Sequence, residues 1–165
     1  MSDASDSTGA PVRWHTREDS GLRLDRELCW WHDGVRVEHP NIIEAFNRGV
    51  QVQPDGRVKL VFGNDWCFVA VDDCQFGITT VDAVPAEGRF SIRLSDRTAE
   101  WLEVKTLELG DDGVLVATVK NGAARARFSR DAQFQLMSHA EAESDPLTFR
   151  IGSTVVPTEL SLPRA

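Results

Sequence analysis

Short turn signals divide this chain into apolar segments of only a few residues, and this spacing limits the fold more than any other feature. Asp-Gly and Asn-Gly pairs tolerate the positive φ angles of tight hairpin turns. They occur at Asp33-Gly34, Asp55-Gly56, Asp112-Gly113 and Asn121-Gly122. Between the turns apolar and polar residues alternate, as around Val58, Leu60 and Phe62, which is typical of half-buried strands. The sequence therefore predicts a meander of short antiparallel strands.

The first segment with a helical period begins at Pro40. Proline suits the first position of a helix, because its missing N–H would have no partner there. Apolar residues up to Phe46 then lie on one helix face. Gly49 is placed to end the helix as its C-terminal cap. We predict a helix over residues 40–49.

A second helical segment follows Ser129, which is a good N-cap residue. Phe134 and Met137 are spaced for one face of this helix, and Asp145-Pro146 stops it. We predict a helix over residues 129–142. Two helices among antiparallel strands indicate an α+β fold.

Composition along the chain suggests three parts. Residues 1–11 are polar and of low complexity, and we predict a disordered tail over residues 1–24. The turn at residues 85–88 is the best internal boundary. We therefore predict an N-terminal β-rich subdomain over residues 25–86 and a C-terminal one over residues 87–165. Their similarity is a pattern of elements and not of residues, so the sequence alone does not establish a duplication.

The charge balance argues against a general nucleic-acid binder. The chain has 165 residues, with 18 Lys and Arg against 26 Asp and Glu, for a net charge of −8. A protein that binds nucleic acid needs a basic surface, because Lys and Arg must neutralise the backbone phosphates. A hydrophobic fraction of 41% also excludes a wholly disordered chain. We expect a globular protein that does not bind nucleic acid and is long enough to fold without disulfides.

The three cysteines, Cys29, Cys67 and Cys74, are an odd and low count. Such a count fits reduced thiols better than a disulfide framework. No secretory signal is recognisable, and no apolar run approaches the ~18 residues of a membrane span. We expect a cytoplasmic protein that does not bind membranes.

The motifs of the common enzyme classes are absent. The chain has no phosphate-binding glycine loop, no dinucleotide-binding glycine pattern, no zinc-protease motif and no serine-hydrolase elbow. Metal ligands could come from Cys29, His32 and His39, or from Cys67 and Cys74. Neither set has the four-ligand spacing of a structural zinc site. We therefore expect no metal and no other cofactor.

A few polar positions could support acid–base chemistry. His32 follows Trp31 at a predicted turn, and histidine is the usual general base near neutral pH. Asp72 and Asp73 directly follow an apolar strand and could bind a cation or act as an acid–base pair. A surface histidine and a solvated strand end explain the same pattern, and we favour these structural interpretations. The four residues remain secondary site candidates.

The segment VKNGAARARFSR is the strongest candidate for a ligand site. Its four cations lie in a stretch without any acid. Arg125 and Arg127 are two apart on a predicted strand and share a face, and a guanidinium suits carboxylate or phosphate. Arg130 lies in the first turn of the next helix, where free N–H groups favour anions. We predict an anion site at Lys120, Arg125, Arg127 and Arg130, with pairing to acids across the sheet as the structural alternative.

The same segments resemble a bacterial family, domain-of-unknown-function family 1285. The resemblance rests on the Asp55-Gly56 turn and on the motifs WHDGVRVEHPNIIEAFNRG, VAVDDCQF and VKNGAARARFSRDAQFQL. It covers about residues 28–152. Gln75 stands where the family has proline.

The resemblance implies two similar, mainly antiparallel β subdomains with one helix each, the C-terminal one similar to a pleckstrin-homology-like module. It implies ligand or protein binding in signal transduction, with no established enzymatic activity and no catalytic residues. We expect a binding module that takes an anionic small molecule or an acidic protein partner, with a homo-oligomer left open. The alternative is a small enzyme with an acid–base site near His32 or Asp72 and Asp73.

Overall fold

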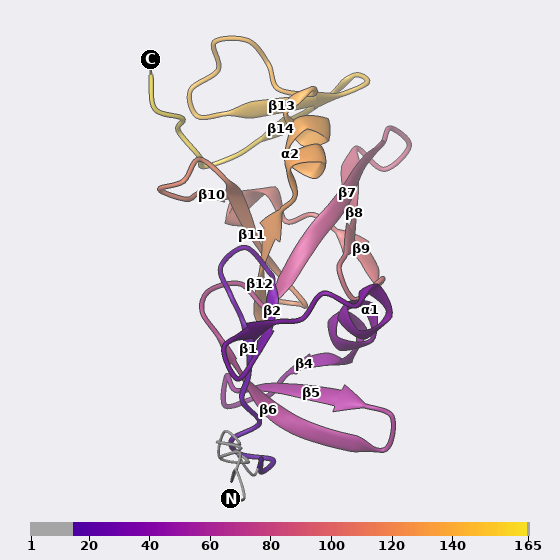
Figure 1. Ribbon diagram of the computed structural model, residues 1–165. Coiled ribbons are helices and arrows are strands. Elements are labelled where there is room, and N and C mark those ends of the chain that lie inside the picture. Colours follow the sequence, from indigo (N-terminus) through magenta and orange to yellow (C-terminus); the bar gives the residue numbers. More distant parts are fainter. Residues whose placement is uncertain (1–14, 165) are drawn as a thin grey trace, which may run out of the picture.

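The chain forms two halves, and each half contains a six-stranded sheet. Each of these sheets consists of two three-stranded antiparallel units that are joined by one parallel pair of strands. The computed structural model describes residues 15–164 (Figure 1). The first sheet has the strand order β3-β2-β1-β6-β5-β4. The second sheet, read from its opposite edge, has the order β9-β8-β7-β12-β11-β10. Both halves therefore have the same topology, and the α+β fold with two similar β subdomains is confirmed.

The first sheet comes from residues 22–71. Its elements are β1 (Leu22–Leu24), β2 (Trp30–His32), β3 (Val35–Arg36), α1 (Pro40–Gly49), β4 (Val50–Val52), β5 (Val58–Phe62) and β6 (Asp65–Val71). The predicted helix over residues 40–49 is confirmed. It packs on the sheet through Phe46, whose ring meets Trp30 edge-on at 5.3 Å. The Trp30 indole N–H also donates to Asn47 Oδ1 at 2.8 Å.

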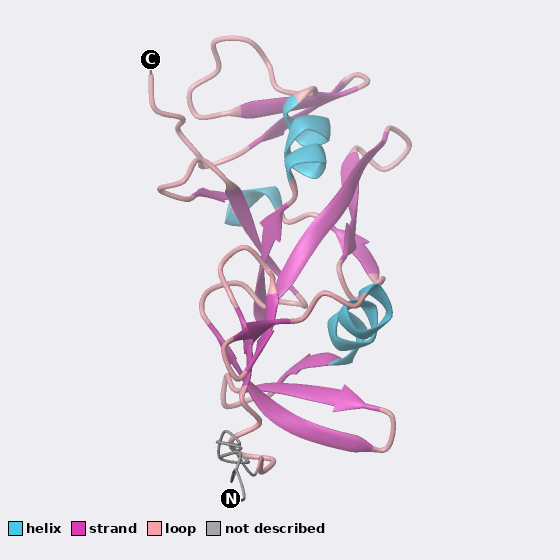
Figure 2. Cartoon of the chain, viewed as in Figure 1, coloured by secondary structure: helices cyan, strands magenta, loops and turns pink. Residues whose placement is uncertain are grey.

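The second sheet is followed by a helix and a separate hairpin (Figure 2). The sheet elements are β7 (Phe76–Val84), β8 (Arg89–Leu94), β9 (Ala99–Trp101), the 3₁₀ turn η1 (Val104–Thr106), β10 (Glu108–Leu109), β11 (Leu115–Val119) and β12 (Ala124–Phe128). After them come α2 (Arg130–Met137), β13 (Thr148–Ile151) and β14 (Thr154–Pro157). The likeness of this half to a pleckstrin-homology-like module stays a prediction.

The predicted meander is wrong at one step, because β6 does not pair with β7. The end of β6 stays on β1, where Asp72 N donates to Leu24 O at 3.0 Å. The start of β7 lies on β12, where Gln75 N donates to Arg125 O at 3.2 Å. The chain thus changes sheets at residues 72–75. The boundary predicted between residues 86 and 87 is wrong, since residues 85–88 form the turn of the β7–β8 hairpin.

Two predicted element ends also differ from the structure. Part of the predicted tail over residues 1–24 is folded, because Leu22–Leu24 forms β1 and Leu24 is buried in the core; residues 1–14 lie outside the described residues. The helix predicted over residues 129–142 ends at Met137. Ala140 already pairs with Phe149 of β13, so the chain must leave the helix before it.

One hydrophobic core runs through both halves. Trp30 of the first half and Phe76, Phe90 and Phe149 of the second are fully buried in the same cluster. The two sheets therefore fold around a shared interior. Among residues 15–164, no helix has the length and apolar character needed to cross a membrane.

Candidate functional site

Arg125 and Arg127 lie on the same face of β12, as their spacing predicts, and both reach acids. Arg125 Nη1 lies 2.9 Å from Asp73 Oδ1, and its Nη2 lies 3.1 Å from Glu108 Oε2. Arg127 Nη1 lies 2.7 Å from Asp112 Oδ2. The pairing with acids, which the sequence left as the structural alternative, is thus present for both arginines.

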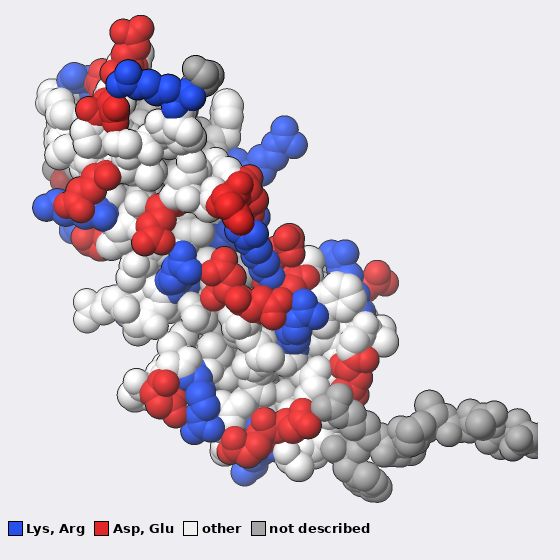
Figure 3. Space-filling view, turned by 90° about the vertical axis from the view of Figure 1, so that its left-hand side faces the viewer, with Lys and Arg blue, Asp and Glu red and all other residues white. Residues whose placement is uncertain are grey.

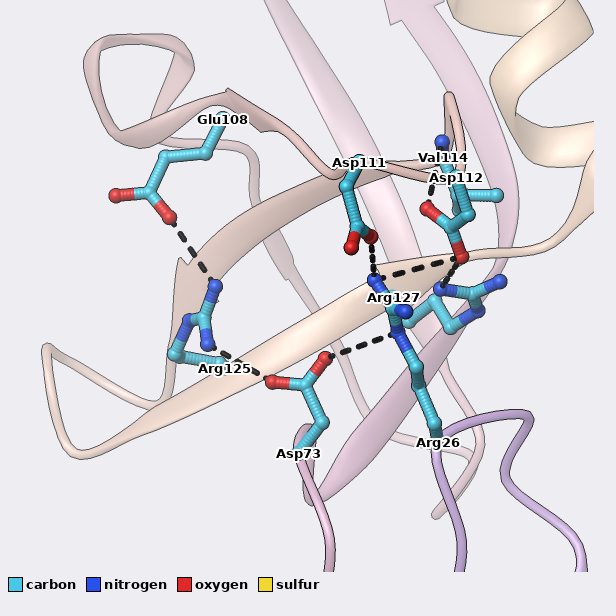
Figure 4. Close-up of polar contacts among 8 residues, drawn as sticks. All are labelled: Arg26, Asp73, Glu108, Asp111, Asp112, Val114, Arg125 and Arg127. Atoms are coloured by element: carbon cyan, nitrogen blue, oxygen red, sulfur yellow. Dashed lines mark hydrogen bonds and ion pairs between the residues drawn. The ribbon is translucent and has the colours of Figure 1, made fainter.

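A third arginine connects this network to the first half of the chain (Figure 4). Arg26, in the β1–β2 loop, contacts Asp111 and lies 3.8 Å from Asp112 Oδ2. The hydrogen bond from Arg26 lowers the pKa of Asp111, and the one from Arg127 lowers the pKa of Asp112. Figure 3 shows opposite charges interspersed across the middle of this face. The network therefore pairs three arginines with four acids and links the two halves.

Lys120 contacts a different acid. Its Nζ lies 2.6 Å from Asp96 Oδ2 and 2.8 Å from Thr98 Oγ1, and 5.0 Å from the centre of the Phe76 ring. Burial raises the pKa of Asp96, but the hydrogen bonds from Lys120 and Thr98 outweigh it, so this pKa lies below its usual value. The four predicted cations are thus not brought together at one point.

Arg130 differs from the other three cations, because it has no ion pair within residues 15–164. It is the first residue of α2, and the preceding Ser129 caps the helix by accepting a hydrogen bond from Ala132 N at 3.1 Å. Both Arg130 and Arg127 line a cavity of about 730 Å³. Arg130 is therefore an exposed cation at the edge of a concave site.

This cavity lies between the two halves of the molecule. Leu28 of the β1–β2 loop lines it together with Ile78 of β7 and with Phe134 and Met137 of α2. A Cβ added to Gly77 would lie 2.9 Å from Leu28 Cδ1, so glycine at this position lets the loop approach β7. The cavity thus combines an apolar wall with two arginines.

Helix α2 is held firmly as one wall of the cavity. Gln133 Oε1 accepts from Leu115 N at 2.8 Å, and its Nε2 donates to Gly113 O at 3.0 Å. Gln135 Oε1 accepts from Val81 N at 2.8 Å. The buried face of α2 is formed by Ala132 and Leu136, whereas Phe134 is 77% exposed.

The exposure of Phe134 corrects the helix face that the sequence predicted. The sequence placed Phe134 and Met137 on one apolar face of the helix, but Ala132 and Leu136 form the buried face. Glu27 is the acidic side chain in the lining, and sequence reasoning missed it together with Leu28. No local signal marks either loop residue, because the loop meets α2 only in the folded chain.

The secondary candidates Asp72 and Asp73 point to different partners. Arg23 Nε donates to both carboxylate oxygens of Asp72 at 3.0 Å, and Arg23 Nη2 donates to Asp72 Oδ2 at 2.8 Å. This contact lowers the pKa of Asp72. Asp73 instead pairs with Arg125. The Trp31 indole N–H donates to Asp25 Oδ2 at 2.7 Å and so helps to order the β1–β2 loop.

His32 lies in a cluster that sequence reasoning missed. Its Nε2 is 3.7 Å from Asp33 Oδ2, and His15 Nε2 is 2.7 Å from the same oxygen. The centres of the two imidazole rings are 4.8 Å apart. No short spacing could have revealed this cluster, because His15 reaches it from the segment that precedes β1.

Comparison with known proteins shows the fold. No protein-family model and no curated protein matches this chain. A DUF1285 family protein from Silicibacter pomeroyi DSS-3 is similar in structure, with a TM-score of 0.61 and 15% identity over 83% of this chain and 78% of that one. A second, from Shewanella baltica OS155, has a TM-score of 0.50 and 15% identity over 67% of this chain and 85% of that one. The chain shares its fold with two proteins of the family that its sequence motifs resemble.

Proposed function

We propose that this protein is a ligand-binding module whose cavity between the two halves takes a small molecule with an anionic group and an apolar part. The observation that supports this most is the position of Arg130, a cation without an ion pair within residues 15–164, at a cavity with an apolar wall. A volume of about 730 Å³ lies within the range of small-molecule sites.

The chemistry of the lining supports one orientation of such a ligand. The anionic group lies at Arg130, because Arg127 is already paired with Asp112. The apolar part lies against Leu28 and Phe134, whose exposed ring gains most from being covered. A molecule with both parts is favoured over a simple anion. Because Arg130 is exposed, water competes with an anion that contacts this side chain alone, and such an anion would bind weakly.

A role in signal transduction and a cytoplasmic location belong to the same proposal. They are supported by the family resemblance of the sequence and by the odd, low number of cysteines. An acidic protein partner is the competing occupant of the same site.

Thermal unfolding with three small probes tests the proposal. Octyl phosphate has an anion and an apolar chain, octyl glucoside has the same chain with an uncharged sugar head, and inorganic phosphate has only the anion. We expect octyl phosphate to raise the Tm more than either of the other two, because a ligand that prefers the native state stabilises it. A charged hydrogen bond contributes roughly 1.5–3 kcal/mol, so Arg130→Ala is expected to weaken binding about ten- to a hundredfold.

Arg93→Ala is the matched control, since Arg93 is exposed on β8 and does not line the cavity. This variant is expected to respond to octyl phosphate like the wild type. An equal response of Arg130→Ala and wild type contradicts the proposal. If polyglutamate stabilises the protein and octyl phosphate does not, the proposal of a small-molecule ligand is overturned, and an acidic protein partner is the occupant of the site.

A further inference from the structure

Two imidazoles and one carboxylate converge at the start of the first sheet. His15 Nε2 and His32 Nε2 lie 2.7 and 3.7 Å from the same atom, Asp33 Oδ2. All three potential ligand atoms lie within 4.8 Å of one another. The three side chains therefore offer two nitrogens and one oxygen to a single point.

The backbone holds two of these residues in place. Asp33 is the first residue of the two-residue β2–β3 turn, with a φ of 48°, and its N–H donates to Gly21 O at 3.0 Å. A Cβ added to Gly21 would lie 2.2 Å from Asp33 Oδ1 and 2.8 Å from His15 Cε1. Only glycine therefore lets β1 come so close to the cluster. His32 is the last residue of β2 and pairs with Leu22.

The segment with His15 is also attached to the fold. Thr16 N donates to Asp19 O at 3.1 Å, across the bend at residues 17 and 18. The next residue, Arg17, accepts at its backbone oxygen a hydrogen bond from Phe68 N of β6 at 2.8 Å. The convergence of the three side chains thus follows from backbone contacts on both sides of the site.

We propose that His15, His32 and Asp33 bind a divalent transition-metal ion, with zinc as the best match. Imidazole nitrogens and a carboxylate oxygen are zinc ligands, and three protein ligands leave a fourth position open for water. Softer metals need thiolates, and calcium or magnesium needs mainly oxygens, so this donor set favours zinc and its first-row neighbours. These three ligands differ from the two groups that the sequence suggested, which were Cys29 with His32 and His39, and Cys67 with Cys74.

Metal binding requires a local change, because ligand atoms that lie within 4.8 Å of one another must take up the spacing of a metal site. Two ligands of a tetrahedral zinc ion lie about 3.3 Å apart, from metal–ligand distances of about 2.0–2.1 Å. The 3.7 Å between His32 Nε2 and Asp33 Oδ2 is close to this separation. The 2.7 Å contact of His15 must lengthen, as His15 gives up the hydrogen at Nε2 and binds as the Nδ1–H tautomer.

Zinc titration of the full chain, followed by calorimetry, tests the site. We expect one equivalent of zinc to bind to the wild type. We expect the zinc affinity to decrease as the pH is lowered, because protons compete with the metal for the imidazoles. Loss of even an outer partner of a metal ligand costs roughly 10- to 100-fold in affinity, so His15→Ala, His32→Ala and Asp33→Asn are each expected to lose at least that. Asparagine keeps the turn, since it tolerates a positive φ.

His39→Ala is the control, because it removes an exposed histidine that lies outside the cluster. Cys29→Ser and Cys67→Ser test the thiols. Unchanged zinc binding in these three variants supports the site. Equal binding by wild type and His32→Ala, or loss of binding in a cysteine variant, overturns it.

A measurement on the wild type alone removes any dependence on the folding of variants. Zinc is expected to shift the imidazole NMR signals of His15 and His32 and to leave those of His39 and His139 in place. Shifts of all four histidines, or of none, contradict a site at this cluster.

Discussion

Gln75 and Arg125 hold each other by two hydrogen bonds. Gln75 N donates to Arg125 O at 3.2 Å, and Arg125 N donates to Gln75 Oε1 at 2.9 Å. These bonds extend the parallel pairing of β7 and β12 beyond its first residue pair, Phe76 and Ala126. A proline at this place could form neither bond. Gln75 therefore strengthens the pairing on which the topology of the second half depends.

Substitution of Gln75 tests this role. Gln75→Ala removes the side-chain bond and is expected to destabilise the protein by about 0.5–1.5 kcal/mol. Gln75→Pro removes both bonds and is expected to cost more than Gln75→Ala. Urea unfolding measures both variants. A proline variant as stable as the wild type contradicts the assigned role.

Arg127 and Arg130 are expected to differ in their effect on stability. Arg127 is 14% exposed and bonded to Asp112, so Arg127→Ala leaves this acid without its main partner. We expect this variant to lower the Tm by several degrees without any ligand. Arg130→Ala is expected to change stability by less than about 0.5 kcal/mol, as exposed positions do. Calorimetric melts check both, and a reversed order refutes the assignment.

Stability in acid is expected to depend on Asp96. The folded state lowers its pKa below that of the unfolded chain, through hydrogen bonds from Lys120 and Thr98 that outweigh burial. The stabilisation of the folded state by ionised Asp96 is therefore complete above the unfolded pKa of about 3.9. It is lost as the pH falls through the lower pKa of the folded state. Asp96→Asn is expected to be less stable at pH 7 by about 1.5–3 kcal/mol.

The measurement is the free energy of unfolding from pH 7 down to pH 2. The wild type should lose its advantage over Asp96→Asn on the acid side. Parallel curves for the two proteins would show that Asp96 does not titrate with folding. Asparagine can still accept the hydrogen bond from Thr98 N, so the variant tests the charge and not the turn.

Cys74 is expected to be inert in the folded protein. It is fully buried, and burial, followed by the charge of Asp73, raises its pKa to about 11. The thiolate is the reactive form. Iodoacetamide at pH 8 should therefore modify Cys29 and Cys67, which are partly exposed, before Cys74. Mass spectrometry of digested protein reads the order, and early labelling of Cys74 would refute it.

Local features were well predicted from the sequence. Asp33 and Gly34 form a two-residue turn with φ angles of 48° and 78°, as the dipeptide indicates. Pro40 begins α1, and Ser129 caps α2 through its side chain. Each feature depends on bonds and backbone angles within a few residues of the chain, which the local sequence specifies.

Gly49 marks the limit of such local reasoning. Glycine after a helix indicates a left-handed cap, but Gly49 is the last helical residue and has no positive φ. Its reason is a contact with a distant strand, since a Cβ there would lie 2.1 Å from Val61 O. The residue type was informative, and only the packing of α1 on β5 supplied its physical cause.

The sequence by itself determined the hairpin turns, the helix starts and the shared face of Arg125 and Arg127, but it did not reveal β1, which lies in the predicted tail. Only the tertiary structure decided that β1 pairs with β6 and β7 with β12, that acids neutralise both arginines, and that His15 meets Asp33. Turn and cap contacts join neighbours in the chain. Parallel pairings, the cavity and the histidine cluster join distant segments, and their meeting depends on how the whole chain buries its apolar surface.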